Sequence, residues 1–152
     1  MTRQLARPLP AATALAVALT ASGCDVGPKP IRYGRDECAE CKMSLVDRRY
    51  GAELVTAKGK IYIFDDLNCL VTFQRRDPAR LGSTPKAFVV DFARPASFVP
   101  ADQAVFLQHE GLRPPMASGL AGFASETELD ATRRQLGTGG RLLRWPQVLA
   151  LP

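Results

Sequence analysis

The chain has 152 residues, of which 46% are hydrophobic and 23% are charged. These values are ordinary for a globular protein, and the length suits one domain or two very small ones. The net charge of +5 falls to +3 without Arg3 and Arg7, because 18 basic residues then face 15 acidic ones. Lys and Arg do not cluster with interleaved aromatic residues, so nucleic acid is not an expected partner.

Residues 1–23 are predicted to be a targeting segment. Arg3 and Arg7 give it a positive start, and the apolar run over residues 11–19 is too short to span a bilayer permanently. The small residues before Cys24 resemble a bacterial lipobox, in which cleavage precedes the cysteine and its sulfur becomes a thioether to a diacylglycerol. We therefore predict a lipoprotein of the bacterial envelope, lipid-anchored to the membrane and facing the periplasm. The alternative is an ordinary signal peptide cut nearby, which leaves Cys24 a free thiol.

The remainder of the chain is predicted to be a tether followed by one domain. Residues 24–35 contain Pro28 and Pro30, which do not start a regular element well, so this stretch is expected to be extended. Residues 36–152 form the predicted domain. It divides into two halves at about residues 36–95 and 100–150.

The first half is predicted to have the order ββαβ. Gly59 marks a hairpin turn, and Asp65 or Asp66 can cap a helix. The Asp65-Asp66 pair could also suggest a hard-metal or acid site, but a helix cap explains it, and we assign it no chemistry. The predicted elements are strands over residues 50–56, 61–64 and 86–92, and a helix from residue 67 that stops before Asp77-Pro78.

The second half is predicted to repeat this order. Ser125 begins a capping box with Glu128, and the glycines after residue 136 end the helix. The predicted elements are strands over residues 103–108, 120–123 and 141–145, the last closed by Pro146, and a helix over 126–136. Phe64 and Phe123 mark a weak repeat at a spacing of about 59 residues. The fold class is therefore α+β, with two small ββαβ-type repeats packed together.

Sulfur ligands are concentrated early in this domain. Cys38, Cys41 and Met43 lie within six positions, and Cys69 follows in the predicted helix. Thiolate and thioether sulfur are soft donors that select Cu(I). Cys41 and Met43 are two residues apart, so their side chains would share a face in an extended backbone. Met116, in a loop rich in Pro and Gly, is a further candidate ligand.

Other readings of these residues stay open. Cys38 and Cys41 could form a redox pair, although the acidic residues around them raise a thiol pKa. They could also form a structural zinc site with Cys69 and His109, the single histidine, which is likewise a candidate copper ligand. Some of these residues could instead have no ligand role. The methionines could fill gaps in the core, Cys69 could be a buried helix residue, and His109 could be a surface residue.

Four short motifs in this order resemble the NosL family of copper-binding lipoproteins. The motifs are Cys41-Lys42-Met43, the run from Gly59 to Asp65, the run from Pro115 to Gly119, and Phe123 with its helix. The resemblance implies two ββαβ halves, a lipid anchor and copper delivery, with nitrous oxide reductase as the receiving enzyme. We take Cys38 and Cys69 as additions to the Cys-x-Met pattern. No hydrolase, phosphate-loop or zincin motif occurs, so an enzyme is not predicted.

Overall fold

The structure is a computed structural model that describes residues 27–152 except residue 138. The predicted signal peptide and Cys24 lie outside the described residues, so the lipid anchor stays a prediction. Among the residues that the structure describes, no helix is long and apolar enough to cross a membrane.

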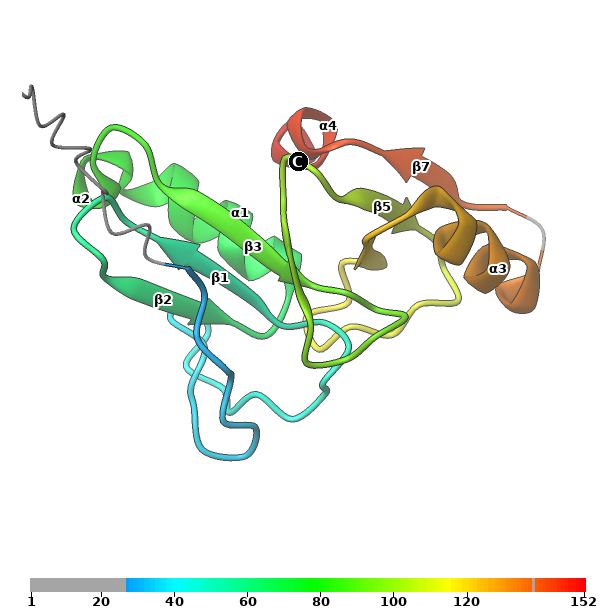
Figure 1. The fold of residues 1–152 in the computed structure, drawn as a ribbon, viewed down its shortest axis with the longest axis horizontal. Coiled ribbons are helices and arrows are strands. Elements are labelled where there is room, and N and C mark those ends of the chain that lie inside the picture. Colours follow the sequence, from blue (N-terminus) through cyan, green and yellow to red (C-terminus); the bar gives the residue numbers. More distant parts are fainter. Residues whose placement is uncertain (1–26, 138) are drawn as a thin grey trace, which may run out of the picture.

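The first half is a four-stranded antiparallel sheet with helices on one side (Figure 1). Its strand order is β2-β1-β3-β4, so β1 lies in the interior of the sheet. Its elements are β1 Ala52–Val55, β2 Ile61–Phe64, α1 Leu67–Arg76, α2 Pro78–Leu81, β3 Lys86–Val90 and β4 Phe98–Pro100.

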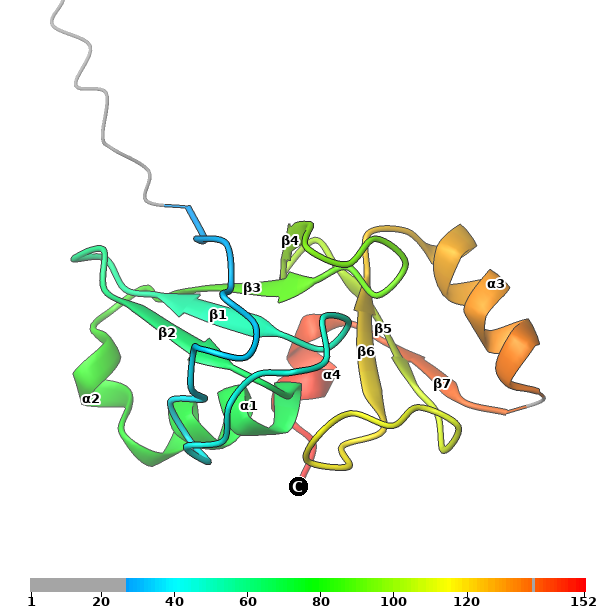
Figure 2. The same cartoon turned by 90° about the horizontal axis from the view of Figure 1, so that it is seen from below.

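The second half is a smaller three-stranded sheet of order β6-β5-β7, which lies beside the first (Figure 2). Its elements are β5 Val105–Gln108, β6 Leu120–Phe123, α3 Glu126–Leu136, β7 Arg141–Leu143 and α4 Trp145–Leu149. Both halves thus contain the order ββαβ, and the predicted α+β fold with two packed repeats is confirmed.

The repeat extends to strand pairing. In each half the first strand is central and pairs antiparallel with the second and third. Phe64 stands opposite Ala52, the first residue of β1, and Phe123 stands opposite Val105, the first residue of β5. The same register therefore recurs at the position of the two phenylalanines, which supports the internal repeat.

Local signals account for the helices that were predicted. Asp66 caps α1, and Ser125 caps α3, because each side chain accepts a backbone N–H of the first turn. The aromatic ring of Phe73 in α1 packs against Phe64 of β2, with ring centroids 5.3 Å apart. This contact fixes α1 against the end of the β1–β2 hairpin.

Three short elements were not predicted: α2, β4 and α4. The prediction that residues 141–145 form a strand closed by Pro146 is wrong at its end. Trp145 begins α4, and Pro146 stands in the first turn of that helix. Proline is tolerated there because the first N–H groups of a helix have no internal partner.

The two sheets touch where β3 approaches β6. A parallel bridge joins Asp91 to Gly122, and a Cβ added at Gly122 would lie 2.7 Å from the Val89 side chain. Any larger residue at position 122 would push the sheets apart. The absence of a side chain at Gly122 is thus a condition for the close packing of the halves.

The interior of β1 contains a carboxylate, Glu53, that has no exposed surface. One of its oxygens accepts the backbone N–H of Lys29 at 2.9 Å, and the other has no partner in the described part of the chain. Burial raises the pKa of Glu53 to about 7, and the nearby charge of Asp36 acts in the same direction. The N-terminal segment around Lys29 therefore covers a group that is partly charged near neutral pH.

Replacement of Glu53 by Gln is expected to stabilise the protein at alkaline pH. The pKa of Glu53 in the folded protein lies above its ordinary value of 4.5. Protonated Glu53 therefore contributes its full share to the unfolding free energy below pH 4.5, and this contribution is lost as the pH rises through 7. Gln keeps an acceptor for Lys29 and cannot ionise. Glu53→Gln should gain roughly 1–3 kcal/mol over the wild type at pH 8 and much less near pH 4.5.

Urea unfolding at the two pH values measures this difference. Glu110→Gln, which changes an exposed carboxylate, is the matched control and should show no such trend. A gain for Glu53→Gln that does not change with pH would show that Glu53 stays charged in the folded protein.

Candidate metal centre

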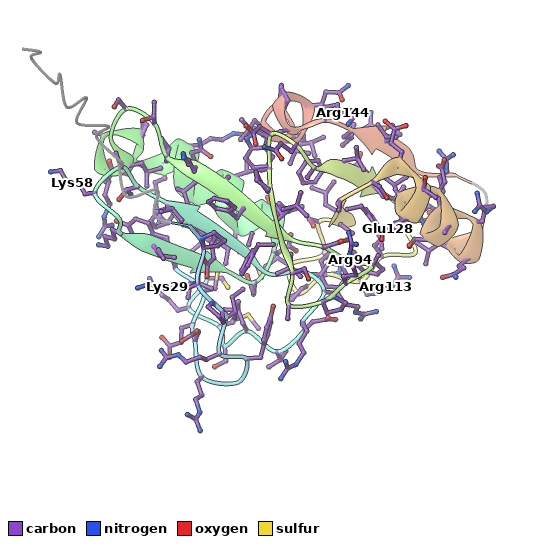
Figure 3. The ribbon with its side chains drawn as sticks, in the orientation of Figure 1. Lys29, Lys58, Arg94, Arg113, Glu128 and Arg144 are labelled. Atoms are coloured by element: carbon purple, nitrogen blue, oxygen red, sulfur yellow. The ribbon has the colours of Figure 1, made fainter. Side chains whose placement is uncertain are left out.

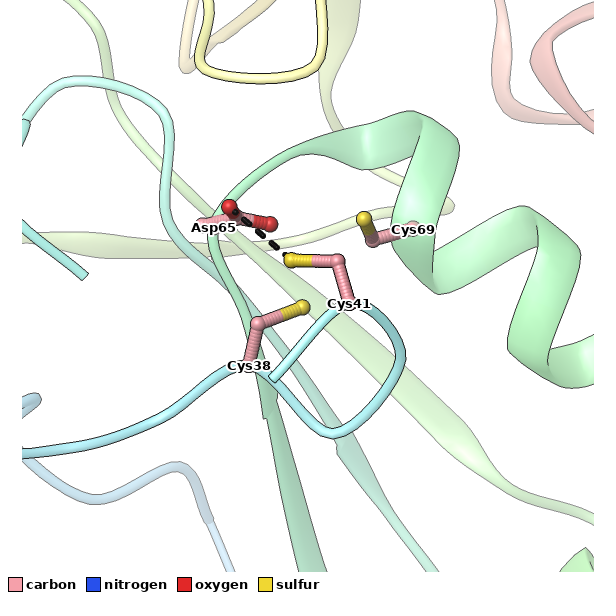
Figure 4. A group of neighbouring side chains, drawn as sticks. All are labelled: Cys38, Cys41, Asp65 and Cys69. Carbon is pink, nitrogen blue, oxygen red and sulfur yellow. Dashed lines mark hydrogen bonds between the residues drawn. The ribbon is translucent and has the colours of Figure 1, made fainter. Parts of the chain in front are cut away.

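Four side chains from three separate segments converge beside the start of α1. The ligand atoms of Cys38, Cys41, Asp65 and Cys69 all lie within 4.8 Å of one another (Figure 4). The first two belong to a turn before β1, Asp65 directly follows β2, and Cys69 lies in the first turn of α1. Cys38 and Cys69 are buried, whereas Cys41 is partly exposed. We call these four residues the thiol cluster.

Backbone hydrogen bonds shape the turn that carries Cys38 and Cys41. The Cys38 N–H donates to the carbonyl of Met43 at 2.8 Å, and the Lys42 N–H donates to the carbonyl of Cys38 at 3.1 Å. Ala39, between the two cysteines, donates its N–H to the carbonyl of Ile63 at 2.7 Å. The turn is therefore attached to the free edge of β2, the strand that leads to Asp65.

Lys42 has a φ of 66°, in the left-handed region. The backbone between Cys41 and Met43 is thus not extended, and the expectation that their side chains share a face by strand alternation does not apply. The Lys42 side chain donates a hydrogen bond to the carbonyl of Ala39 at 2.8 Å, which helps to close the turn. The conformation instead lets the turn fold back so that Cys38 and Cys41 face the same centre.

The two consecutive aspartates have different roles. Asp66 caps α1 by accepting the N–H of Asn68 at 2.9 Å. Asp65 takes no part in the cap, and its Oδ2 accepts a hydrogen bond from the Cys41 thiol at 3.4 Å. Its other oxygen, Oδ1, is buried without a partner among the described residues, which marks it as available to a proton or a cation. The sequence did contain a signal for this, because a helix needs only one capping carboxylate.

The three thiols ionise unequally. A hydrogen bond from Cys69, aided by backbone N–H groups of the same turn, lowers the pKa of Cys38 to about 6 against the effect of burial. Burial raises the pKa of Cys41 to about 11, and the hydrogen bond to Cys38 together with burial raises the pKa of Cys69. The cluster thus stabilises one thiolate, and further thiolates require a cation.

Both candidate methionines lie on segments next to the thiol cluster. Met43 is 54% exposed and directly follows the turn. Met116 is 38% exposed, and its backbone N–H donates to Asp66 Oδ2 at 3.0 Å. The N–H of Ser118 approaches the same oxygen at 3.5 Å. The β5–β6 loop of the second half is thereby fastened to the residue next to Asp65.

His109 lies elsewhere. It is buried at the end of β5, where its Nδ1 accepts the N–H of Gly111 at 2.8 Å. A Cβ at Gly140 would lie 2.7 Å from its ring, so its surroundings belong to the second half. The residue that joins the three cysteines is Asp65, and His109 is not part of the thiol cluster.

The fold and the cluster define a small α+β protein with a sulfur-rich site suited to a metal ion. The sequence matches the NosL family over residues 31–150, and the chain belongs to this family. The fold is similar to the crystal structure of the copper chaperone NosL from Shewanella denitrificans, with a TM-score of 0.66 and 22% sequence identity. That match covers 80% of this chain and 95% of the other. Comparison with curated protein sequences gives no match.

Removal of the Asp66 carboxylate is expected to loosen the Met116 loop as well as the start of α1. Asp66→Ala removes a helix cap and leaves the N–H of Met116 without its acceptor, which together should cost about 2–4 kcal/mol of unfolding free energy. Amide hydrogen exchange should accelerate at residues 116 and 118.

Asp77→Ala is the matched control, because Asp77 caps α2 without reaching the second half. Its cost should be about 1 kcal/mol, with unchanged exchange in the Met116 loop. Equal behaviour of the two variants would mean that Asp66 does not hold the loop.

Proposed function

We propose that this protein is a copper chaperone that holds one Cu(I) ion in the thiol cluster and passes it to a copper enzyme of the cell envelope. The observation that carries the proposal is the convergence of three thiols and one carboxylate within 4.8 Å. Soft sulfur ligands favour Cu(I) over harder ions. Membership of the NosL family and the fold shared with a copper chaperone support the same conclusion.

The roles of the cluster residues follow from their environments. Cys38 supplies the first thiolate, because the cluster already stabilises its charge. Cys41 and Cys69 lose their protons when the ion enters, the proton of Cys69 passing to bulk water, and three sulfurs are enough for Cu(I). The carboxylate of Asp65 is a hard ligand that suits Cu(I) poorly. We therefore propose that Asp65 does not bind the ion and instead accepts the proton that Cys41 releases.

Copper transfer would proceed by ligand exchange on the exposed side. Cys41 is the most accessible of the three thiols, and Met43 and Met116 are exposed on segments next to the cluster. We propose that one methionine at a time, Met43 or Met116, binds the ion as a fourth ligand. A thioether binds Cu(I) without carrying a charge, so it would be the first ligand released to a partner.

The receiving enzyme we propose is nitrous oxide reductase, on the basis of the sequence resemblance alone. The location we propose is the periplasmic side of a membrane, with the lipid on Cys24. Mass measurement of the purified chain tests the lipid. Incubation of the copper-loaded protein with metal-free nitrous oxide reductase tests delivery, which should restore copper to the enzyme faster than the same amount of free Cu(I).

Loss of one cluster thiol is expected to weaken Cu(I) binding. Competition titration of the reduced protein against a Cu(I) chelator should show a loss of at least about tenfold in Cys41→Ser and in Cys69→Ser. Cys24→Ser, which leaves the cluster intact, is the control and should bind as the wild type does. Equal affinities for all forms would reject the cluster as the copper site.

A structural zinc site is the second candidate, and Asp65 is the observation in its favour. Three thiolates and one carboxylate complete the four ligands that Zn²⁺ commonly takes. Asp65→Ala separates the two: it should lower Zn²⁺ affinity at least about tenfold and change Cu(I) affinity little. Zinc at one equivalent that Cu(I) cannot displace would favour the structural site, and metal-free protein with disulfide-exchange activity would favour a redox role.

A further inference from the structure

The turn of the β1–β2 hairpin and the end of α2 line a hollow of about 310 Å³ that shares no residue with the thiol cluster. Lys58, Lys60 and Arg80 line it, together with the hydroxyl-bearing Thr56 and Ser83, and no carboxylate does. We call this hollow the hairpin pocket. Its lining is suited to a negatively charged group.

Two of the cations share one aromatic ring. The Lys60 ammonium lies 4.7 Å from the centroid of Tyr62, and the Arg80 guanidinium lies 5.9 Å from the same centroid. In the described part of the chain, neither side chain forms a salt bridge. Two positive charges gathered at one ring repel each other, and a bound anion would remove this repulsion.

The nearby carboxylate of Asp77 forms no ion pair with these cations in the described part of the chain. It begins α2 and accepts the backbone N–H of Arg80 at 3.2 Å, so it is engaged as the helix cap. It is not among the residues that line the hairpin pocket. The pocket is therefore lined by three cations and by no carboxylate.

The hairpin holds its lysines on a fixed frame. The N–H of Thr56 donates to the carbonyl of Lys60 at 2.9 Å, and the N–H of Lys60 donates to the Thr56 hydroxyl at 3.0 Å. Gly59 supplies the positive φ of 78° that the turn requires. An anion would thus meet a preformed turn.

The hairpin pocket and the thiol cluster lie at opposite ends of β2. The strand begins next to Lys60 and ends next to Asp65, a separation of about 13 Å for its four residues. In Figure 3, Lys58 lies at one extreme of the long axis of the molecule. A surface that touches the hairpin pocket would leave the thiol cluster about one strand length away from it.

The chain length allows a membrane to reach this end. Lys29 is held at Glu53 in β1, about 13 Å along the strand direction from the turn that starts at Ala57. Cys24 precedes Lys29 by five residues, which span at most about 18 Å. A lipid on Cys24 would therefore place the headgroups within reach of Lys58.

We infer that the hairpin pocket binds the phosphate group of anionic phospholipid headgroups, with Lys58, Lys60 and Arg80 as its cations. This contact orients the anchored protein so that the thiol cluster points away from the membrane, toward a partner in the periplasm. The inference rests on the proposed lipid anchor and does not depend on which metal the cluster binds.

The test uses the full acylated chain in vesicles of phosphatidylcholine, alone or mixed with phosphatidylglycerol. Amide hydrogen exchange over residues 56–60 and 79–83 should slow about fivefold in the anionic vesicles, and high salt should abolish the effect. The triple variant Lys58→Gln, Lys60→Gln, Arg80→Gln should lose it. Arg133→Gln with Arg134→Gln, which removes two cations in the second half, should keep it.

Two results would overturn the inference. Equal exchange in the two kinds of vesicle would show that headgroups do not bind at the hairpin pocket. The same slowing by inorganic phosphate in neutral vesicles would assign the pocket to a free anion and not to lipid. The intact mass reports whether the chain is acylated, and Cu(I) titration of the triple variant reports whether its metal site is folded. These two controls distinguish failure of headgroup binding from failure of the lipid anchor or of the copper site.

Discussion

The carboxylate of Asp66 connects the two halves of the molecule directly beside the thiol cluster. One of its oxygens caps α1, and the other accepts backbone N–H groups from Met116 and Ser118 of the second half. Because Asp66 is fully buried, these bonds are shielded from competing water. The helix start fixed in this way determines where Cys69 and Asp65 lie. The loop fixed by the same group determines where Met116 lies.

The two halves share the arrangement of their strands and helix but differ in the side chains at the corresponding positions. At a spacing of 59 residues, the positions of Asp65, Asp66 and Cys69 correspond to Ala124, Ser125 and Glu128. Ser125 repeats the capping role of Asp66, so the scaffold function is retained in both halves. The cluster residues Asp65 and Cys69 are not repeated, because Ala124 and Glu128 stand at the corresponding positions. The second half instead contributes its long β5–β6 loop, which reaches across to the first.

The parts of the fold that the sequence predicted are those with local signals, such as the glycine of the hairpin and the caps of α1 and α3. The missed elements are short, and Pro146 was read as a stop although it stands in the first turn of α4. The cysteines were found because sulfur is rare and clustered. Asp65 was considered as part of a metal or acid site and set aside, because a helix cap explained both aspartates. Neither the left-handed Lys42 nor the hydrogen bond from Met116 to Asp66 leaves a pattern in residue spacing.

A copper carrier must hold its ion firmly and still release it, and the gradient of exposure in this site meets both needs. Cys38 and Cys69 are almost completely buried, Cys41 is partly exposed, and Met43 is more than half exposed at 54%. The raised pKa values of Cys41 and Cys69 keep both thiols protonated without an ion, so an entering ion must displace their protons, and the return of these protons would help its release. In the copper site that we propose, the outer ligands would be accessible and the thioether would carry no charge, so a partner could compete for the ion there first. The same arrangement suits a permanent zinc site less well. Such a site does not need exposed methionines, and a ligand in contact with solvent, such as Cys41, makes the ion easier to remove.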